Sequence, residues 1–280
     1  MQTFKPMKKR LRFLLIMCLM AVLGNMSFVQ AQSPKTLEVG PHFGATSYVG
    51  DLNVWRHLPQ WNWKEFNQFH YEYGGVVRYN YDSRWSFRLD YTFLHARAKD
   101  PITSWRPQSL LNFQTTAHDV SLLVEFNFLD YYTGKNDKGF SPYIFGGVSG
   151  FLYKVRPFTG DEAIDAYEFD LPNKSLAIPF GVGLKISISE HLAATTEWRM
   201  HYTFTDNFDG VTGDYPASSE HIVVKDSQGN DYDLTDPTGT FLDGFQRGNS
   251  SNHDWIGMFN LSLTWKFIIP DNAACKLTVQ

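Results

Sequence analysis

Residues 176–204 read LAIPFGVGLKISISEHLAATTEWRMHYTF and alternate apolar side chains with small or polar ones. From Leu176 to Ile188 every second residue is apolar, and a short polar turn, Ser189–His191, follows. The alternation then restarts and runs to Phe204, interrupted only at Thr196. A period of two predicts β-strands, and a three-residue connection predicts that the two strands pair as an antiparallel hairpin.

These strands are longer than those of soluble sheets. Each has about 11–13 residues, against the ~5–6 that are usual in globular proteins, and this length is enough to cross a bilayer with tilt. Lys185, Glu197 and Arg199 lie in mid-strand on the polar parity, whereas the other parity is an uninterrupted apolar stripe. This pattern predicts lipid outside and a small polar lumen inside, the reverse of a soluble barrel.

Six further stretches alternate in the same way, at residues 36–48, 69–81, 85–93, 120–128, 141–153 and 255–267. The prediction is therefore an all-β fold, an eight-stranded antiparallel transmembrane β-barrel with long extracellular loops. Long connections would lie outside the cell, at residues 51–68, 99–112 and 205–253, and short turns in the periplasm, at residues 82–84, 130–139 and 189–191. Glycines leave the lipid-facing parity of the fifth strand open, because Gly146, Gly147 and Gly150 suit either face.

The N-terminus carries five basic residues before an unbroken apolar run, Phe13 to Leu23, and Ala31 closes a small-residue cleavage pattern. We expect residues 1–31 to be a signal peptide, residues 32–267 the barrel in the cell outer membrane, and residues 268–280 a periplasmic C-terminal tail. Without the signal, 20 Lys and Arg stand against 29 Asp and Glu, a balance that disfavours nucleic acid as a partner. Cys275 is then the only cysteine, which excludes an internal disulfide and a zinc site of cysteines but leaves its own state open.

Charged residues at lumen-facing positions need partners, because an eight-stranded barrel is just wide enough for side chains to fill. We expect an ion-pair network that plugs the lumen, with a proton or ion path as the alternative. The predicted members are Glu38, Arg78, Arg88, Asp90, Glu125, Lys185, Glu197, Arg199 and Lys266, and Glu72 also points inward.

The sequence gives no sign of catalysis, so we expect no enzyme activity, no cofactor and no metal site. Four histidines, His42, His70, His118 and His201, lie on separate strands without the short spacing of metal ligands or a catalytic base. The last loop has nine Asp and Glu against two Lys and Arg. Its candidates for calcium, Asp226, Asp231, Asp233 and Asp236, do not follow the calcium-loop pattern, so a solvated acidic loop is favoured and calcium stays open.

Several stretches resemble the PorG family. They are Glu38–Gly40 with Phe43–Gly44, Ser47–Asn53, Ile178–Lys185, Glu197–Arg199 and Thr205–Val211. The resemblance implies a small outer-membrane barrel of the type IX protein secretion system that associates with the periplasmic ring built by the PorK lipoprotein and PorN. It implies an accessory or anchoring component embedded in outer-membrane lipid, not the translocation pore.

If that resemblance holds, the docking surface is periplasmic. The longest inner turn offers Asp130, Tyr131, Tyr132 and Lys135, a mixture of aromatic and charged side chains that suits an interface. The two tyrosines could instead belong to the aromatic girdle at the membrane surface. The alternative function is an independent OmpA- or OmpX-like barrel that binds an external partner through its acidic loops.

Overall fold

The computed structural model describes residues 35–49, 70–99, 112–131, 139–157, 173–208, 210, 213–247 and 253–269. The predicted signal peptide, most of the first two predicted outer loops, the tail beyond residue 269, and the docking candidates Tyr132 and Lys135 lie outside these residues.

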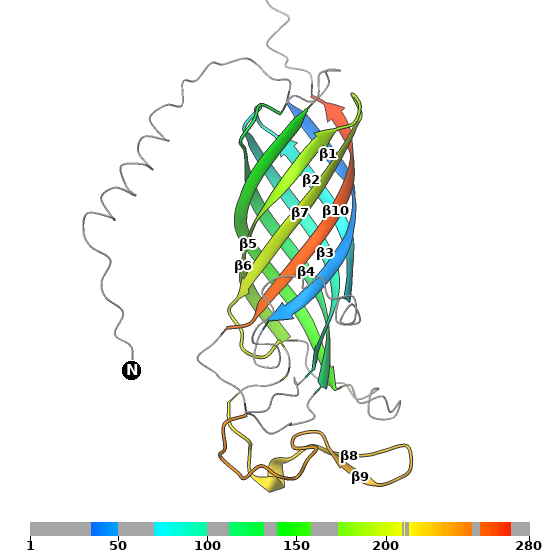
Figure 1. Ribbon diagram of the computed structural model, residues 1–280, viewed down its shortest axis with the longest axis vertical. Coiled ribbons are helices and arrows are strands. Elements are labelled where there is room, and N and C mark those ends of the chain that lie inside the picture. The colour runs from blue at the N-terminus through cyan, green and yellow to red at the C-terminus, as the bar shows by residue number, and fades with distance from the viewer. Residues whose placement is uncertain are drawn as a thin grey trace, which may run out of the picture. The chain divides into compact units, whose positions relative to one another are not determined.

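Eight strands form a closed antiparallel barrel, which confirms the predicted fold class (Figure 1). They are β1 (Thr36–Val49), β2 (His70–Asn80), β3 (Trp85–Lys99), β4 (Asn112–Asn127), β5 (Phe140–Pro157), β6 (Asn173–Ser187), β7 (Leu192–Thr203) and β10 (Trp255–Ile268). Each strand pairs with its neighbour along the chain, and β10 closes the barrel by pairing with both β7 and β1. Closure leaves no strand edge unpaired, as a sheet in lipid requires.

Two glycines show how closely the strands approach one another. A Cβ atom on Gly40 would lie 2.0 Å from the carbonyl oxygen of Leu263, and one on Gly147 would lie 1.9 Å from that of Leu122. No side chain fits at either distance, so only glycine permits these strand contacts.

The outer surface of the barrel is apolar on every strand. Exposed examples, one from each strand in order, are Phe43, Tyr73, Leu89, Leu122, Val148, Val182, Trp198 and Leu261. An apolar belt that surrounds a closed barrel is stable in lipid and not in water. The chain is therefore a membrane-spanning barrel of the outer-membrane type, located in the cell outer membrane. Among the described residues, no helix is both long and apolar enough to cross a bilayer.

The fifth strand decides what fills the lumen. In β5 the aromatic rings of Tyr143, Phe145 and Phe151 are buried inside, while Val148 and Leu152 face lipid. The lumen is therefore charged toward the short turns and apolar toward the extracellular loops. The odd-numbered residues of β5 therefore face the lumen, which settles the parity that the glycines leave open and adds aromatic rings to the polar lumen.

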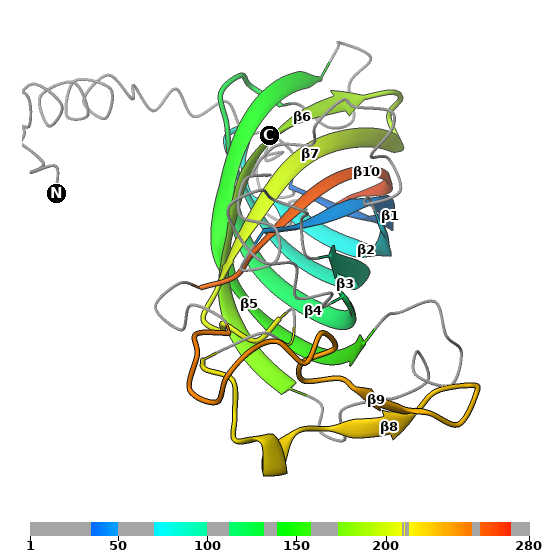
Figure 2. The same ribbon diagram turned by 60° about the horizontal axis from the view of Figure 1, so that its bottom comes forward.

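The last loop contains structure that the sequence analysis does not predict. Two short strands, β8 (Val223–Lys225) and β9 (Asp231–Asp233), pair as a hairpin, and a 3-10 turn, Ser218–Glu220, precedes them. Figure 2 shows this hairpin as a sheet separate from the barrel wall. Period-two patterning is uninformative over strands of only three residues.

Candidate functional site

The charged half of the lumen holds eight of the nine residues predicted to pair there. We call these eight residues the lumen network: Glu38, Arg78, Arg88, Asp90, Glu125, Lys185, Glu197 and Arg199. They come from six strands, and each is at most 3% exposed. The ion pairs join all eight residues into one connected cluster inside the barrel.

Glu125 is the centre of the network on the side nearest the short turns. Its carboxylate lies 3.0 Å from Arg78 Nε, 2.7 Å from Arg88 Nη1 and 2.5 Å from Lys185 Nζ. Arg78 also reaches Glu38 at 2.8 Å. One carboxylate thus holds three cations from three different strands.

A second group continues the network toward the extracellular side. Glu197 pairs with Arg88, and with Arg199 at 3.0 Å. Asp90 lies 3.2 Å from Arg88 Nε and 2.5 Å from Arg199 Nη2. Arg88 therefore joins the two groups into one cluster.

The lumen network is electrically balanced, with four cations and four carboxylates. Balance matters because each buried charge costs several kcal/mol unless partners and hydrogen bonds compensate it. The charges cancel within the cluster, and Arg88 and Glu197 form a bidentate pair. The arrangement fits a structural plug better than an ion path.

Aromatic rings from β5 complete the network, and the sequence analysis missed them. The Tyr143 hydroxyl donates to Glu197, and Lys185 Nζ lies 4.6 Å from the Tyr143 ring centre. The guanidinium groups of Arg88 and Arg199 lie 4.9 and 5.6 Å from the Phe145 ring centre. The available signal was that the opposite parity of this strand, which includes Ile144, Val148 and Leu152, is free of polar side chains up to Lys154.

Tyr131 closes the periplasmic end of the lumen and is not a surface residue. It is 2% exposed, its hydroxyl donates to Glu38 at 3.3 Å, and Lys185 lies 5.5 Å from its ring centre. Burial, and then the Glu38 carboxylate, raise the pKa of its phenol well above the ordinary value, so it remains a hydrogen-bond donor. Its burial corrects the prediction that Tyr131 offers its ring to a periplasmic partner.

The ninth predicted member, Lys266, sits at the same end but pairs differently. Its ammonium donates to Ser187 Oγ and to Ser189 O at 2.9 Å, and it lies 6.0 Å from the Tyr131 ring centre. Within the described part of the chain no ion pair joins it to a carboxylate. Lys266 therefore ties β10 to the turn between β6 and β7.

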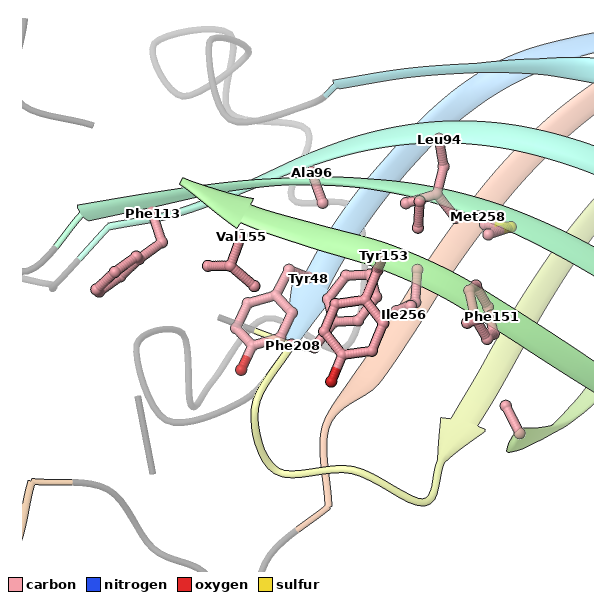
Figure 3. Close-up of a cluster of buried hydrophobic side chains, with 12 residues drawn as sticks. Tyr48, Leu94, Ala96, Phe113, Phe151, Tyr153, Val155, Phe208, Ile256 and Met258 are labelled. Atoms are coloured by element: carbon pink, nitrogen blue, oxygen red, sulfur yellow. The ribbon is translucent and has the colours of Figure 1, made fainter. Parts of the chain in front are cut away.

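An apolar cluster closes the extracellular end (Figure 3). Phe208, from the segment after β7, packs among Tyr48, Phe151 and Tyr153, with ring centres 5.1 to 6.2 Å apart. Asp254 holds this segment in place, because its carboxylate accepts from the Tyr48 hydroxyl at 2.6 Å and from the Phe208 amide at 2.8 Å. The chain thus folds back into its own barrel mouth.

The four candidate histidines do not meet. His42 and His201 face the lumen, where His201 Nε2 lies 3.6 Å from Asp119; His70 also lies on that face. His118 faces lipid, and its Nδ1 is 2.8 Å from the Tyr91 hydroxyl. Across the described ranges, no group of three or more His, Cys, Asp or Glu is arranged to hold a metal ion.

The acidic residues of the last loop are bound by the loop itself. Asp236 accepts from the amides of residues 238, 239 and 241, and Asp226 accepts from those of residues 228 and 230. Asp231 pairs with Lys225. Asp233 pairs with His221 at 2.6 Å, and this hydrogen bond raises the pKa of the histidine. These carboxylates act as turn and hairpin acceptors and do not converge on one point.

Two periplasmic turns join to form one surface. Asp130 lies 2.7 Å from Arg84 Nε and accepts from Ser83 Oγ at 3.1 Å, while the Tyr131 amide donates to Ser83 O. The side chains of Arg84 and Asp130 are 38% and 44% exposed. Of the four predicted docking residues, Asp130 is the one that the structure places at an accessible surface; Tyr132 and Lys135 lie outside the described residues.

These features define a class, an outer-membrane β-barrel whose lumen is closed from both ends. The chain belongs to the family described as Domain of unknown function (DUF6089), whose model matches residues 11–221. A comparison with the curated proteins gives no match.

The chain is similar to three solved outer-membrane proteins. OprG from Pseudomonas aeruginosa is 9% identical with a TM-score of 0.43, and the match covers 86% of this chain and 100% of that chain. Neisserial surface protein A is 12% identical with a TM-score of 0.41, covering 82% and 97%. The N-terminal β-barrel domain of Pseudomonas aeruginosa OprF is 12% identical with a TM-score of 0.40, covering 84% and 100%.

Proposed function

We propose that this chain is an anchoring component of the type IX protein secretion machinery, which holds the periplasmic ring proteins of the PorK and PorN type at the outer membrane. The observation that carries the proposal is the closed lumen. A barrel filled by the lumen network and by the Phe208 cluster passes no protein, so its contribution to secretion must come from its position and its surfaces.

The resemblance to the PorG family supplies the choice of machinery. One resembling segment, Thr205–Val211, contains Phe208, the residue that closes the barrel mouth. Another, Glu197–Arg199, contributes two members of the lumen network. Residues in the resembling segments therefore contribute to filling the lumen. A filled, rigid barrel is suited to hold a partner at the membrane.

The periplasmic surface for docking is the joined pair of turns around Arg84 and Asp130. An exposed pair of opposite charges of this kind can be recognised by a charged partner, since rim charges steer and orient association. Tyr131 supports this surface from below, because its ring fills the lumen beneath the turn.

The test is co-purification of the ring lipoprotein with tagged full-length barrel extracted from outer membranes in mild detergent. Arg84→Glu and Asp130→Arg should each lower the recovery of the lipoprotein about tenfold, as for a contact worth about 1.4 kcal/mol. The matched control is Glu190→Lys, an exposed charge on the other described periplasmic turn, which should leave recovery unchanged.

Folding of each variant is checked by heat-modifiable migration on gels, so that a loss of partner is not confused with a loss of barrel. Failure of the wild-type barrel to recover any ring lipoprotein, even after cross-linking, would contradict the proposal. Unchanged recovery in both turn variants would contradict this docking surface.

The second candidate is a barrel that binds an external partner through its acidic loop. The folded β8–β9 hairpin favours it, because a purely solvated loop needs no ordered sheet. Replacing residues 223–233 with a Gly/Ser linker should abolish binding of the barrel to its surface partner while recovery of the ring lipoprotein stays unchanged. Unchanged binding to the surface partner after this replacement would contradict the second candidate.

A further inference from the structure

A groove interrupts the lipid-facing surface on the strands β3 to β6. Its volume is about 640 Å³, within the range of sites for small ligands, and it lies where these strands approach the extracellular side. The apolar walls are the side chains of Val120, Leu152 and Leu176. The Tyr91 hydroxyl and the His118 ring, hydrogen-bonded to each other at 2.8 Å, form one end.

The groove exists because Gly150 has no side chain. A Cβ atom built on Gly150 meets no atom within 4 Å, so the space in front of this residue is open. Its neighbours of the same parity, Val148 and Leu152, are 61% and 50% exposed and stand on either side as ridges. In a bilayer this hollow faces the hydrocarbon chains of the lipid.

Positive charge gathers at the extracellular mouth of the groove. Lys174 lines the mouth and lies opposite Leu152 in the β5–β6 register. Lys154 and Arg156 follow on the same lipid-facing parity of β5. Among the described residues that line the groove, none has an acidic side chain. Lys174, the cation that lines the mouth, suits an anionic group, because a positive charge near a membrane surface attracts acidic headgroups.

We propose that this groove binds a phosphorylated glycolipid of the outer leaflet, with one acyl chain over Gly150 and a phosphate at Lys174. The apolar hollow and the cationic mouth are adjacent and arranged in the order of an amphiphile, tail toward the membrane centre and headgroup toward the outside. The site lies on the opposite side of the wall from the lumen, so it is independent of the anchoring role.

The test is native mass spectrometry of the full-length barrel in detergent, titrated with monophosphoryl lipid A or with the same glycolipid lacking its phosphate. The wild type should retain one phosphorylated molecule per barrel. Gly150→Leu fills the hollow and should lower occupancy about tenfold, and Lys174→Gln should lower it about fivefold, the effect of about one surface charge.

Gly146→Leu is the matched control, because Gly146 has the same parity on the same strand, lies outside the groove, and would place its Cβ no closer than 3.8 Å to another atom. It should bind like the wild type. Equal occupancy in all variants would overturn the site, and equal binding of the phosphate-free glycolipid by the wild type would overturn the phosphate contact. A loss in Gly146→Leu as large as in Gly150→Leu would also overturn it.

Discussion

Neutralising Glu125 should destabilise the barrel more than any exposed charge change. Glu125→Gln keeps the size and the acceptor oxygen of the side chain but removes one negative charge from a balanced cluster of four cations and four carboxylates. Arg78, Arg88 and Lys185, at 3.0, 2.7 and 2.5 Å, then share the remaining three carboxylates.

The magnitude follows from opposing contributions. At an effective dielectric constant of about 20, each of these three contacts has a gross Coulomb energy of about 6 kcal/mol. Two effects of the substitution offset most of this Coulomb energy. The side chain no longer repels the neighbouring carboxylates, and the desolvation penalty of the Glu125 charge, several kcal/mol, is removed. Removing one partner of a buried pair typically costs about 3–5 kcal/mol, and we expect the free energy of unfolding to fall by that amount.

The assay is urea-induced unfolding of the barrel in lipid vesicles, followed by tryptophan fluorescence and gel migration. Lys185→Met combined with Glu125→Gln restores the balance and should recover at least about half of the loss, because coupled residues are not additive. Glu190→Gln, on an exposed turn, is the control and should change stability by less than about 0.5 kcal/mol. A loss under about 1 kcal/mol for Glu125→Gln, or strict additivity in the double variant, would refute the view of a balanced, buried network.

Three further outcomes are expected. Leu122→Arg on the lipid face should cost about 2–4 kcal/mol in vesicles, whereas Thr264→Arg in the lumen should fail through crowding in both detergent and lipid; equal tolerance of both would contradict the assignment of faces. A protease site at Gly229 should be cut in intact cells, and cleavage only after lysis would reverse the topology. The pKa of His221 is raised by Asp233, so this pair stabilises the loop hairpin below about pH 6.5 and the contribution is lost as pH rises through the raised pKa. Limited proteolysis of the loop should therefore be slower at pH 5.5 than at pH 8.5, with no such difference in His221→Gln.

The barrel could be predicted from the sequence because one physical rule acts along its whole length. Lipid outside and packed charges inside impose a period of two, and long strands such as β6 and β7 display it many times. The members of the lumen network could be predicted from strand parity alone. Side chains such as Arg78 and Glu125 are charged, and of the two faces of the barrel wall only the lumen face stabilises a charge.

The remaining parts depend on contacts that parity does not contain. In β5 the glycines weaken the apolar signal on both faces. The burial of Tyr143 and Phe145 is decided by their contacts with the charged side chains of the lumen network. Tyr131 follows a strand end, and neither burial nor exposure can be read there from spacing. Phe208 closes the mouth through contacts with Asp254 and Tyr48, residues distant in sequence.

Single-channel recording addresses the closed lumen without reference to any partner. Purified, folded barrel is inserted into planar bilayers and the current is measured at constant voltage, with insertion verified by recovery of heat-modifiable protein. We expect no steady conductance steps from the wild-type barrel, because the lumen network and the Phe208 cluster occupy its length. Reproducible steps of uniform size, present in the wild type and unchanged in Phe208→Ala, would contradict the closed lumen and with it the anchoring role.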